Sequence, residues 1–573
     1  MGPSLSGGSR EHILTVVLED YCHVGPVSRV VPPDYWHRFE SRVENNTRRT
    51  LDLLDRVGAK ATFFVLGWIG EHQPQIVAEV VRRGHEVASK GYWHRSIRQM
   101  TPEQFRADVR RAKDVLEQAT GVAVRGYRIP RGGFDESDMW ALDVLAEEGY
   151  VYDSSLRPLG SAFADQPQRR FIHRHDTTAG QLWEVPLSTW KVGQFSVPIS
   201  GGNFVRQLPH GVIRRLIDRW DRRTDKPIVF YFHVWELDPE QPRITAVSRL
   251  QSIRQYRNLE AMAGRITYYL ERYKFNTVAS HLRLDPAPAV VVRPASVAVE
   301  PATVTPTLPA PAEPKIPISV VIPCYNEEAG IGYTANTLRA FSDGMKDRYD
   351  VTFLFVDDGS RDKTWERLNA LFGTRADCLL LRHAQNRGVA ASVLTGVRHA
   401  RTEIVGVIDC DGTYDPLQLR ALVPLLVPGV DMVTASPYHP EGEVLNLPAY
   451  RLILSKGLSL LYRLVHKNKL ATYTACFRVY RRRAVADMVL RDERFVGIAE
   501  ILSRIDRAGG RIVESPAVME VRLLGSSKMK TLKTIVGHLQ HIGRLVVARS
   551  VSAITPGHHA SKEKCRDTAR STN

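Results

Sequence analysis

The sequence lacks closely spaced cysteines, a long apolar run and an apolar leader. Its cysteines are dispersed, which argues against a disulfide framework and against a cysteine zinc site. No stretch approaches the roughly 18–20 consecutive apolar residues of a membrane-spanning helix, and the first twenty residues contain no apolar signal core. We therefore expect a protein of the reducing cytoplasm, either soluble or peripheral at the inner face of the membrane. The six cysteines are Cys22, Cys324, Cys378, Cys410, Cys476 and Cys565.

The chain is long and basic. Its 573 residues exceed what one hydrophobic core usually organises, so two domains are expected. Lys and Arg number 78 against 62 Asp and Glu, a net charge of +16 that favours acidic partners such as nucleotide phosphates, lipid phosphates or an anionic membrane surface. The basic residues are scattered without a nucleic-acid-binding signature, so we expect no nucleic acid partner.

A proline-rich segment divides the chain. Nine prolines between residues 286 and 317 exclude a helix or a central strand, as in an extended linker. Residues 1–11 are then an N-terminal extension, 12–285 and 318–550 are domains, and the polar, basic residues 551–573 are expected to be a disordered tail.

Both domains alternate short apolar runs with helical patterns, as an α/β fold requires. Helices are expected over residues 40–57, 74–83, 102–119 and 137–148 of the first domain. Buried strands are expected over residues 13–18, 61–67, 85–89 and 228–233 of the first domain, and over 318–323, 351–358, 378–383 and 403–411 of the second.

Polar residues with catalytic potential follow strands of the first domain. They are Glu19 and Asp20, His94, Arg128, Asp153 and His233. This ordered series resembles the NodB-homology polysaccharide deacetylases of carbohydrate esterase family 4, which implies a distorted (β/α) barrel over about residues 12–284. The resemblance implies that Glu19 is the base, that Asp20 and His94 are ligands of Zn²⁺ or a similar metal, that Arg128 orients the base, and that His233 protonates the leaving amine.

Two residues depart from the pattern of that family. Glu19 replaces the more usual aspartate, a small departure because a carboxylate is kept. Lys90, in the segment Ala88-Ser89-Lys90-Gly91, replaces the first histidine ligand, and a protonated lysine has no lone pair for a metal. Its ammonium is expected to occupy the place of the cation beside Asp20 and Glu19, which predicts an inactive pseudo-deacetylase. The alternative is an altered hydrolase in which Asp20, His94 and a third ligand such as His23 hold a metal weakly.

The second domain carries a fuller set of motifs. Its first two strands end in Pro323-Cys324-Tyr325-Asn326-Glu327 and in Asp357-Asp358-Gly359-Ser360. Asn386-Arg387-Gly388 follows the third strand and Asp409-Cys410-Asp411 the fourth, where two carboxylates can grip a divalent metal that bridges a diphosphate.

In this order the motifs resemble glycosyltransferase family 2, particularly the dolichol- and polyprenyl-phosphate sugar synthases. The resemblance implies a Rossmann-like GT-A fold and an inverting transferase that uses a nucleotide-diphospho-sugar and Mg²⁺ or Mn²⁺. Asp409 and Asp411 are the implied catalytic and metal-binding residues. The implied nucleotide-sugar-binding residues are Pro323, Tyr325, Asn326, Glu327, Asp357, Asp358, Asn386, Gly388, Arg478, Arg522 and Lys528.

The acceptor is less defined by the sequence. Arg478 suits a phosphate, but Thr472 and Cys476 stand where the related synthases have aspartate and glycine. A lipid phosphate attacks without a base, whereas a sugar hydroxyl needs one, and Glu500 stands where related transferases carry that base. Glu500 is equally compatible with a helix surface. The acceptor is therefore a lipid phosphate, a saccharide or another small molecule.

Two segments, 447–469 and 528–549, place apolar residues at helical spacing among basic ones. Each predicts either an interfacial helix on an anionic membrane or a helix packed on the domain with a basic outer face. As a whole, the sequence predicts a glycosyltransferase fused to an inactive deacetylase-like domain. The alternatives are a bifunctional deacetylase and transferase, and a first domain that only binds carbohydrate.

Overall fold

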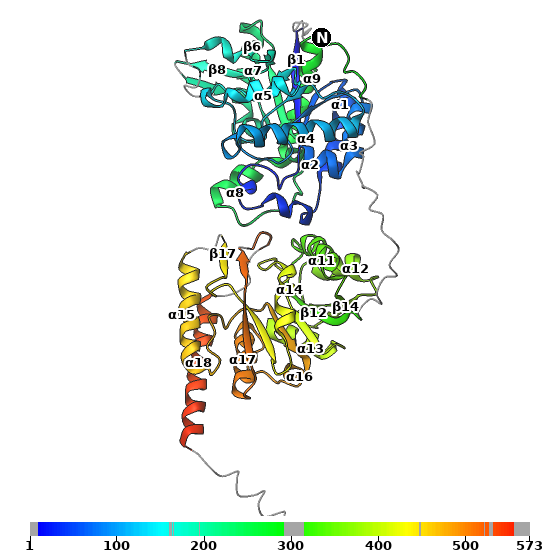
Figure 1. Ribbon diagram of the computed structural model, residues 1–573. Helices are drawn as coiled ribbons and strands as arrows, with labels where there is room; N and C mark the ends of the chain where they lie inside the picture. Colours follow the sequence, from blue (N-terminus) through cyan, green and yellow to red (C-terminus); the bar gives the residue numbers. More distant parts are fainter. Residues whose placement is uncertain are drawn as a thin grey trace, which may run out of the picture. The chain divides into compact units, whose positions relative to one another are not determined.

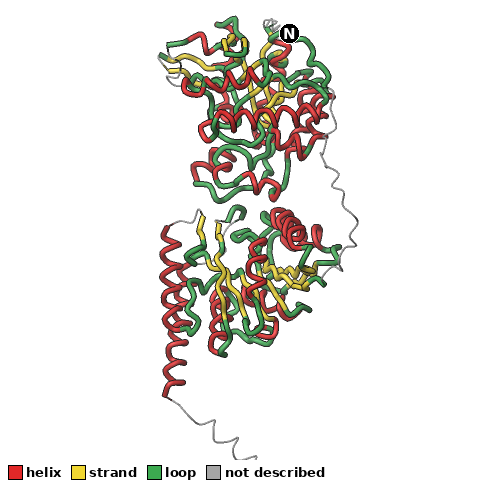
Figure 2. The backbone as a smooth tube through the Cα atoms, viewed as in Figure 1, coloured by secondary structure: helices red, strands yellow, loops and turns green. Residues whose placement is uncertain are grey.

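The structure is a computed structural model that describes residues 10–159, 163, 165–193, 195–290, 314–445, 449–520, 522–525 and 531–554. The chain divides into two compact units, with the boundary between Thr307 and Leu308. Each unit is an α/β structure, as the sequence predicts, with strands enclosed by helices (Figures 1 and 2).

The first unit is built on one nine-stranded sheet in the order β10-β1-β2-β3-β4-β5-β7-β6, with β11 paired to β1. β1 pairs in parallel with both β2 and β10, and all of it except Glu11 is buried. Among the described residues β10 and β6 are not paired, so the expected barrel is open between them. The strands of this unit are β1 (Glu11–Leu18), β2 (Thr62–Val65), β3 (Glu86–Ser89), β4 (Gly126–Tyr127), β5 (Tyr152–Asp153), β6 (His173–Thr177), β7 (Gly180–Glu184), β8 (Thr189–Val192), β9 (Phe195–Pro198), β10 (Val229–His233) and β11 (Lys274–Asn276).

Local signals set the limits of the helices, as α4 illustrates. Thr101 accepts a hydrogen bond from the Gln104 amide (3.3 Å), and the Gln104 side chain accepts one from the Thr101 amide (3.0 Å). This capping box starts the helix, and Gly121 ends it with a φ of 71°. The helices of the first unit are α1 (Val43–Val57), α2 (Gly67–His72), α3 (Pro74–Arg82), α4 (Pro102–Thr120), α5 (Trp140–Glu147), α6 (Gly202–Gln207), α7 (His210–Arg223), α8 (Arg249–Tyr256), α9 (Leu259–Arg272) and α10 (Val278–His281).

The second unit contains a seven-stranded sheet in the order β14-β13-β12-β15-β18-β16-β19. β12 pairs in parallel with β13 on one side and β15 on the other, so the strand order reverses between β12 and β15. In open α/β sheets ligands bind beyond the carboxyl ends of the strands at such a reversal. The strands are β12 (Ile316–Cys324), β13 (Tyr349–Asp357), β14 (Cys378–Arg382), β15 (Ile404–Val407), β16 (Met432–Ser436), β17 (Glu443–Leu445), β18 (Arg478–Arg481), β19 (Ile512–Pro516) and β20 (Val518–Glu520).

The limits expected for the second domain differ slightly from those observed. β12 begins at Ile316, inside the segment expected to be linker, because its first residues pair with Tyr349 and Asp350 of β13. The last helix runs to Ile554, beyond the expected end at residue 550. The helices of this unit are α11 (Ile331–Met345), α12 (Thr364–Phe372), α13 (Val389–His399), α14 (Leu419–Leu422), α15 (Ala449–Val465), α16 (Arg482–Val485), α17 (Phe495–Arg507) and α18 (Thr531–Ile554).

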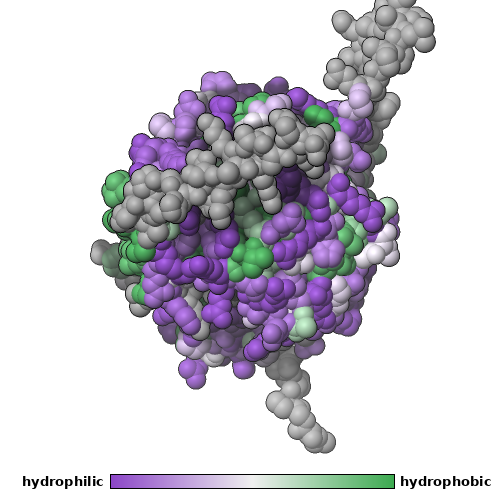
Figure 3. Space-filling view, turned by 90° about the horizontal axis from the view of Figure 1, so that it is seen from below, coloured by the Kyte–Doolittle hydropathy of each residue, from purple (hydrophilic) through white to green (hydrophobic). Residues whose placement is uncertain are grey.

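None of the helices in the described part of the chain is long and apolar enough to cross a membrane. On the face seen in Figure 3, hydrophobic residues form separate patches among hydrophilic ones. The long helices α15 and α18 run side by side (Figure 1), and α18 also packs on α17.

A buried polar network fastens α18 to these two helices. The Tyr462 hydroxyl and His538 Nδ1 lie 2.8 Å apart, and the Ser503 hydroxyl is hydrogen-bonded to His466 Nε2 (2.8 Å) and His541 Nε2 (3.1 Å). His538 is 2% exposed and His541 is 7% exposed. Burial lowers the pKa of each from 6.5 to about 4, so both are neutral at neutral pH.

We expect acid to loosen this attachment. The two histidines are more basic in the unfolded chain than in the folded protein, so the unfolded chain binds more protons as the pH falls. Stability should therefore decrease between about pH 6.5 and pH 4, by about 2 kcal/mol for each histidine from pH 7 to pH 5. Asp492 raises the pKa of both histidines and Glu500 raises that of His541, but burial outweighs them, and Arg544 lowers the pKa of His541 further.

Urea denaturation at pH 7, 6 and 5 measures this dependence, with α18 followed by hydrogen exchange. The variant His538→Gln/His541→Gln should lose most of it while remaining folded at pH 7. An unchanged pH dependence in the variant would contradict the role given to the histidines.

Candidate functional site

The candidate site of the first unit centres on the buried Glu19 carboxylate, which follows β1. His233 Nδ1, at the end of β10, lies 2.7 Å from Oε1. Lys90 Nζ, directly after β3, lies 3.1 Å from Oε2, and His94 Nε2 lies 3.2 Å from the same oxygen. Four of the residues singled out in the sequence thus meet at the carboxyl ends of parallel strands.

Lys90 provides the cation of this cluster. It is 3% exposed, and its ammonium also donates a hydrogen bond to the Pro130 carbonyl at 2.9 Å. Burial alone would raise the pKa of Glu19, but the charges of Lys90 and His94 and the hydrogen bond from His233 hold that pKa well below its usual range. Glu19 is therefore ionised and paired.

Asp20 forms hydrogen bonds outside this cluster. Its Oδ1 accepts a hydrogen bond from the Tyr21 amide (2.9 Å), and its Oδ2 accepts bonds from the Arg42 amide (2.8 Å) and the Ser41 hydroxyl (3.1 Å). The expectation that Lys90 would pair with Asp20 as well as Glu19 is met only for Glu19. Burial raises the pKa of Asp20 to about 6 despite these bonds.

A metal ion does not fit the residues present. His23, the third ligand considered, accepts a hydrogen bond from the Asp20 amide through Nδ1 at 3.1 Å, and His94 Nε2 faces Glu19. In the described ranges, no group of three or more His, Cys, Asp or Glu side chains is arranged to share an ion. The ammonium of Lys90 supplies the positive charge beside the Glu19 carboxylate.

Arg128 does not orient the base. Its guanidinium donates to the Thr15 hydroxyl (2.9 Å) and to the Ser154 hydroxyl (2.7 Å) and carbonyl (3.1 Å), not to Glu19. These bonds tie β1 to the end of β5 across the core, where burial lowers the pKa of Arg128 to about 10. Asp153 binds Ser155, accepting from its hydroxyl at 2.6 Å and from its amide at 2.8 Å.

In the second unit, the segment after β12 forms one wall of the candidate site. Asn326 has a φ of 52°, in the left-handed region that asparagine tolerates, and its Oδ1 accepts a hydrogen bond from the Arg361 amide at 2.8 Å. Pro323 and Tyr325 on either side of Cys324 are partly exposed at this edge. The loops after β12 and β13 are therefore joined.

Asp357, the last residue of β13, and Asp358, which follows it, are both buried. Asp358 accepts hydrogen bonds from His383 Nδ1 (2.7 Å), Asn386 Nδ2 (2.9 Å) and the amides of Arg387 (2.9 Å) and Gly388 (2.7 Å). Asp357 accepts a bond from the Ser360 amide (3.2 Å) and lies 3.0 Å from Arg382 Nε. Both are predicted from the sequence to contact a nucleotide, and in the structure their bonds hold the neighbouring loops.

Gly388 has a structural reason for being glycine. Its φ is 120°, and a Cβ atom there would lie 2.4 Å from the Glu493 carbonyl oxygen. The turn between β14 and α13 therefore depends on this residue.

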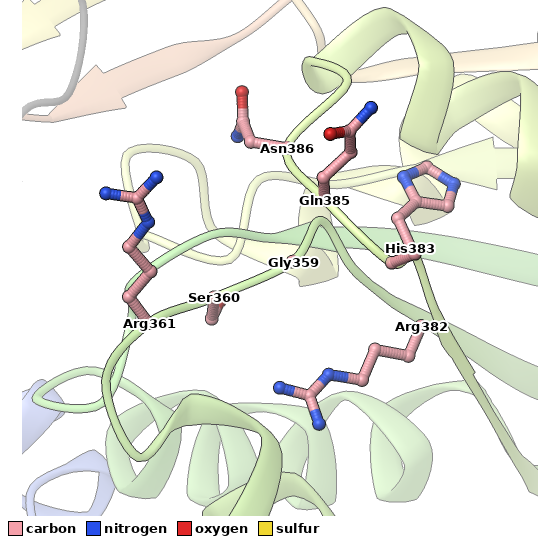
Figure 4. Close-up of a pocket in the computed structure, with 8 residues that line it drawn as sticks. Gly359, Ser360, Arg361, Arg382, His383, Gln385 and Asn386 are labelled. Atoms are coloured by element: carbon pink, nitrogen blue, oxygen red, sulfur yellow. The ribbon is translucent and has the colours of Figure 1, made fainter.

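A pocket of about 610 Å³ lies between these loops (Figure 4). Gly359, Ser360 and Arg361 come from the loop after β13, and the residues from Arg382 to Asn386 come from the end of β14 and the loop that follows. The guanidinium group of Arg361 gives the pocket positive charge, whereas that of Arg382 is paired with Asp357 at 3.0 Å. Of these lining residues, the motifs of the sequence indicate Asn386 but not Arg361, Arg382 or Gln385, although their place at strand ends is a signal.

Asp409 and Asp411 follow β15 at the reversal of strand order. Burial and the neighbouring Asp411 raise the pKa of Asp409 to about 7, and Asp411 Oδ1 accepts bonds from the Thr413 amide (3.1 Å) and hydroxyl (2.8 Å). Arg522 pairs with Glu327 and places Nη1 3.7 Å from Asp411 Oδ2. Two carboxylates that repel each other at a strand edge suit a divalent cation, so these residues fit Mg²⁺ or Mn²⁺.

Two residues expected at the acceptor side are used in packing. Arg478 is fully buried and donates to the carbonyls of Tyr473 and Ile498, both at 2.7 Å, so it has no free face for a phosphate. Glu500 accepts bonds from the Arg491 and Asp492 amides (3.1 Å) and from Arg504 (2.8 Å). Lys528 lies outside the described residues.

The pKa of Glu500 agrees with this assignment. Burial alone would raise it, but the hydrogen bonds from Arg504 and the two amides lower it below its usual value. A carboxylate held in this way is a weak proton acceptor.

Known proteins similar to this chain match each unit separately. Dolichol-phosphate mannosyltransferase of Pyrococcus furiosus is 29% identical over 231 residues, which are 40% of this chain and 63% of that protein. The chain therefore spans less than two thirds of the length of this relative.

Two crystal structures resemble the units in turn. A polysaccharide deacetylase from Mycobacterium smegmatis, described by its authors as putative, is 19% identical with a TM-score of 0.33 and covers 51% of this chain and 99% of its own. Glucosyl-3-phosphoglycerate synthase from Mycobacterium tuberculosis, in complex with Mn²⁺, uridine-diphosphate-glucose and phosphoglyceric acid, is also 19% identical, with a TM-score of 0.31, and covers 40% of this chain and 79% of its own.

Three sequence families match along the chain. Residues 33–152 match "Polysaccharide deacetylase", residues 154–283 match "Domain of unknown function (DUF3473)", and residues 319–489 match "Glycosyl transferase family 2". The chain therefore joins a polysaccharide deacetylase domain, extended by a DUF3473 domain, to a glycosyltransferase of family 2.

Proposed function

We propose that the second unit transfers a sugar from a nucleotide-diphospho-sugar to a lipid-phosphate acceptor with inversion, and that the first unit is not a metal-dependent deacetylase. The observation that carries the first part is the pair of carboxylates, Asp409 and Asp411, at the point where the strand order reverses. Family 2 membership supports the reaction type.

Asp409 and Asp411 would hold Mg²⁺ or Mn²⁺. The ion supplies positive charge that stabilises the leaving diphosphate. Arg522, 3.7 Å from Asp411, adds a fixed positive charge at the same edge, and its pairing with Glu327 holds it in position. The nucleotide lies along the loops that Asp357 and Asp358 shape, with the pocket of Arg361, Arg382 and Asn386 available to its polar groups.

A lipid phosphate suits this site better than a sugar hydroxyl. A phosphate is already an anion and needs no general base, whereas a hydroxyl does. Glu500, the base expected from the sequence, is held by Arg504 and two backbone amides. The similarity to a dolichol-phosphate mannosyltransferase supports the same acceptor class.

For the first unit, the contact between Lys90 and Glu19 supports the absence of a metal-dependent reaction. Glu19, the expected general base, and the Lys90 ammonium neutralise each other. Both carboxylate oxygens of Asp20 accept hydrogen bonds from neighbouring amides and from the Ser41 hydroxyl. A bifunctional enzyme would instead release acetate from an N-acetylated sugar when metal is added. Glycan binding that survives Glu19→Ala and His233→Ala without release of acetate would indicate a carbohydrate-binding module.

Calorimetry tests the transferase site. The full chain, titrated with uridine, guanosine and thymidine diphosphates with and without Mn²⁺, should bind one of them more tightly with the metal. Asp411→Asn should remove the effect of Mn²⁺ and lower turnover at least about 100-fold, because a charge that stabilises the leaving group is lost.

Asp343→Asn is the matched control, since it removes an exposed carboxylate of α11 that pairs with Lys346 and takes part in none of the contacts described for the site. It should leave binding unchanged. Absence of nucleotide binding in the unchanged protein, or an equal loss in both variants, would disprove the proposed site.

A double-mutant cycle tests the pairing in the first unit. Lys90→Met should lower the free energy of unfolding by about 3–5 kcal/mol, because it leaves a buried carboxylate without its ammonium. Adding Glu19→Gln should recover much of that loss, since the uncompensated charge is then gone. Chemical denaturation of the full chain, followed in the first unit, measures both.

Lys274→Met, at an exposed position of β11, controls for the loss of a lysine. Additive effects of Lys90→Met and Glu19→Gln would contradict the ion pair. Release of acetate by the unchanged protein in the presence of Zn²⁺ would contradict the inactive first unit.

A further inference from the structure

Two adjoining hollows lie along α18. The first is between α17 and α18, and the second is lined by α18 and by Arg491, which precedes α17. Neither is lined by Asp409, Asp411 or the loops after β12 and β13. Their volumes are about 520 and 630 Å³, and both are lined by Arg491, Arg544 and Ala548. The first is also lined by Arg504 and Arg507. We call Arg491, Arg504, Arg507 and Arg544 the arginine pocket.

The arginine pocket carries an excess of positive charge. Glu500 pairs with Arg504 at 2.8 Å and offsets one of the four guanidinium groups. Within the described part of the chain, the side chains of Arg491 and Arg507 make no hydrogen bond or ion pair, and Arg544 donates to the Gln540 carbonyl of its own helix at 3.2 Å. His541, which also lines the pocket, is neutral at pH 7 because burial lowers its pKa to about 4. Three guanidinium charges therefore lack an acidic partner.

Exposed apolar side chains lie on the two helices beside the pocket. Val546 and Val547 of α18 are 47% and 63% exposed, and Val536 and Leu539 precede them at helical spacing. On α15, which packs against α18, Ile453, Leu460 and Leu464 recur at helical spacing and are 70%, 60% and 65% exposed. Exposed apolar side chains that lie together mark an interaction surface more often than apolar side chains scattered singly.

We propose that the arginine pocket binds the phosphate groups of anionic lipid headgroups, with the apolar side chains of α15 and α18 entering the membrane surface. The planar guanidinium group donates paired hydrogen bonds to phosphate oxygens, so several together form a phosphate site. A soluble phosphate would be recognised by the arginines alone, whereas a lipid also accounts for the exposed valines and leucines around them.

This surface contact goes beyond the transfer reaction. It is measured without donor sugar, so failure of one proposal does not decide the other. In this proposal the basic and apolar residues of α18 contact the membrane. The buried His538 and His541 on the same helix hold α18 to the protein.

Sedimentation of the full chain with phosphatidylcholine vesicles, with and without phosphatidylglycerol, tests the site. We expect binding only to the anionic vesicles, weakened by salt. The variant Arg491→Gln/Arg507→Gln/Arg544→Gln should bind about a hundredfold more weakly, at roughly fivefold per arginine near an anionic surface.

A matched variant, Arg339→Gln/Arg367→Gln/Arg420→Gln, removes three exposed arginines from other surfaces of the same unit and should bind as the unchanged protein does. Val546→Ser/Val547→Ser should also weaken binding, while leaving nucleotide binding intact. Equal losses in the two arginine variants would mean that overall charge, not the pocket, attracts the vesicles. That result would overturn the proposal. So would a lack of binding to anionic vesicles, or calorimetry that shows binding of inorganic phosphate when the vesicles are not bound.

Discussion

Parallel strands end at the same edge of a sheet, and this constraint brings together the functional residues of both units. In the first unit it gathers Glu19, Lys90 and His233 from the ends of β1, β3 and β10, which lie far apart in the sequence. In the second it sets Asp409 beside the loop after β12, because β12 and β15 are neighbours. Loops can change at such an edge without altering the sheet beneath, so one kind of architecture supports two different sites.

Much of the fold could be predicted from the sequence because the signals are local. Apolar runs marked β1, β10, β12 and β13 to within a few residues, and the prolines marked the break between the units. The short strands β4 and β5 contain too few residues to show a periodic pattern, so the sequence does not predict their limits. The end of α18 was placed four residues too early because the short stretch from Val551 to Ile554 carries no stop signal of its own before the polar, basic residues that follow.

The candidate sites were predicted less completely, since a motif names residues but not their partners. The position of Lys90 beside Glu19 followed from charge and could be foreseen. Arg478 and Glu500 could not be separated from ligand-binding residues by sequence, because only the folded chain shows that backbone groups use their hydrogen-bonding capacity. Asp358 likewise fixes the loop from His383 to Gly388, so one wall of the pocket beside it is formed by the protein's own hydrogen bonds, which lowers the conformational entropy lost by any ligand that binds there.

Lys90 also changes how the first unit depends on its surroundings. A metal ion is exchanged with the solvent, competes with other ions and is removed by chelators, whereas an ammonium on a side chain is present in every copy of the protein. On the proposal that the first unit works without a metal, its folded state does not depend on the metal supply of the cell, and a chelating agent should leave it intact. The pair of Lys90 and Glu19 is then a permanent part of the framework of the domain.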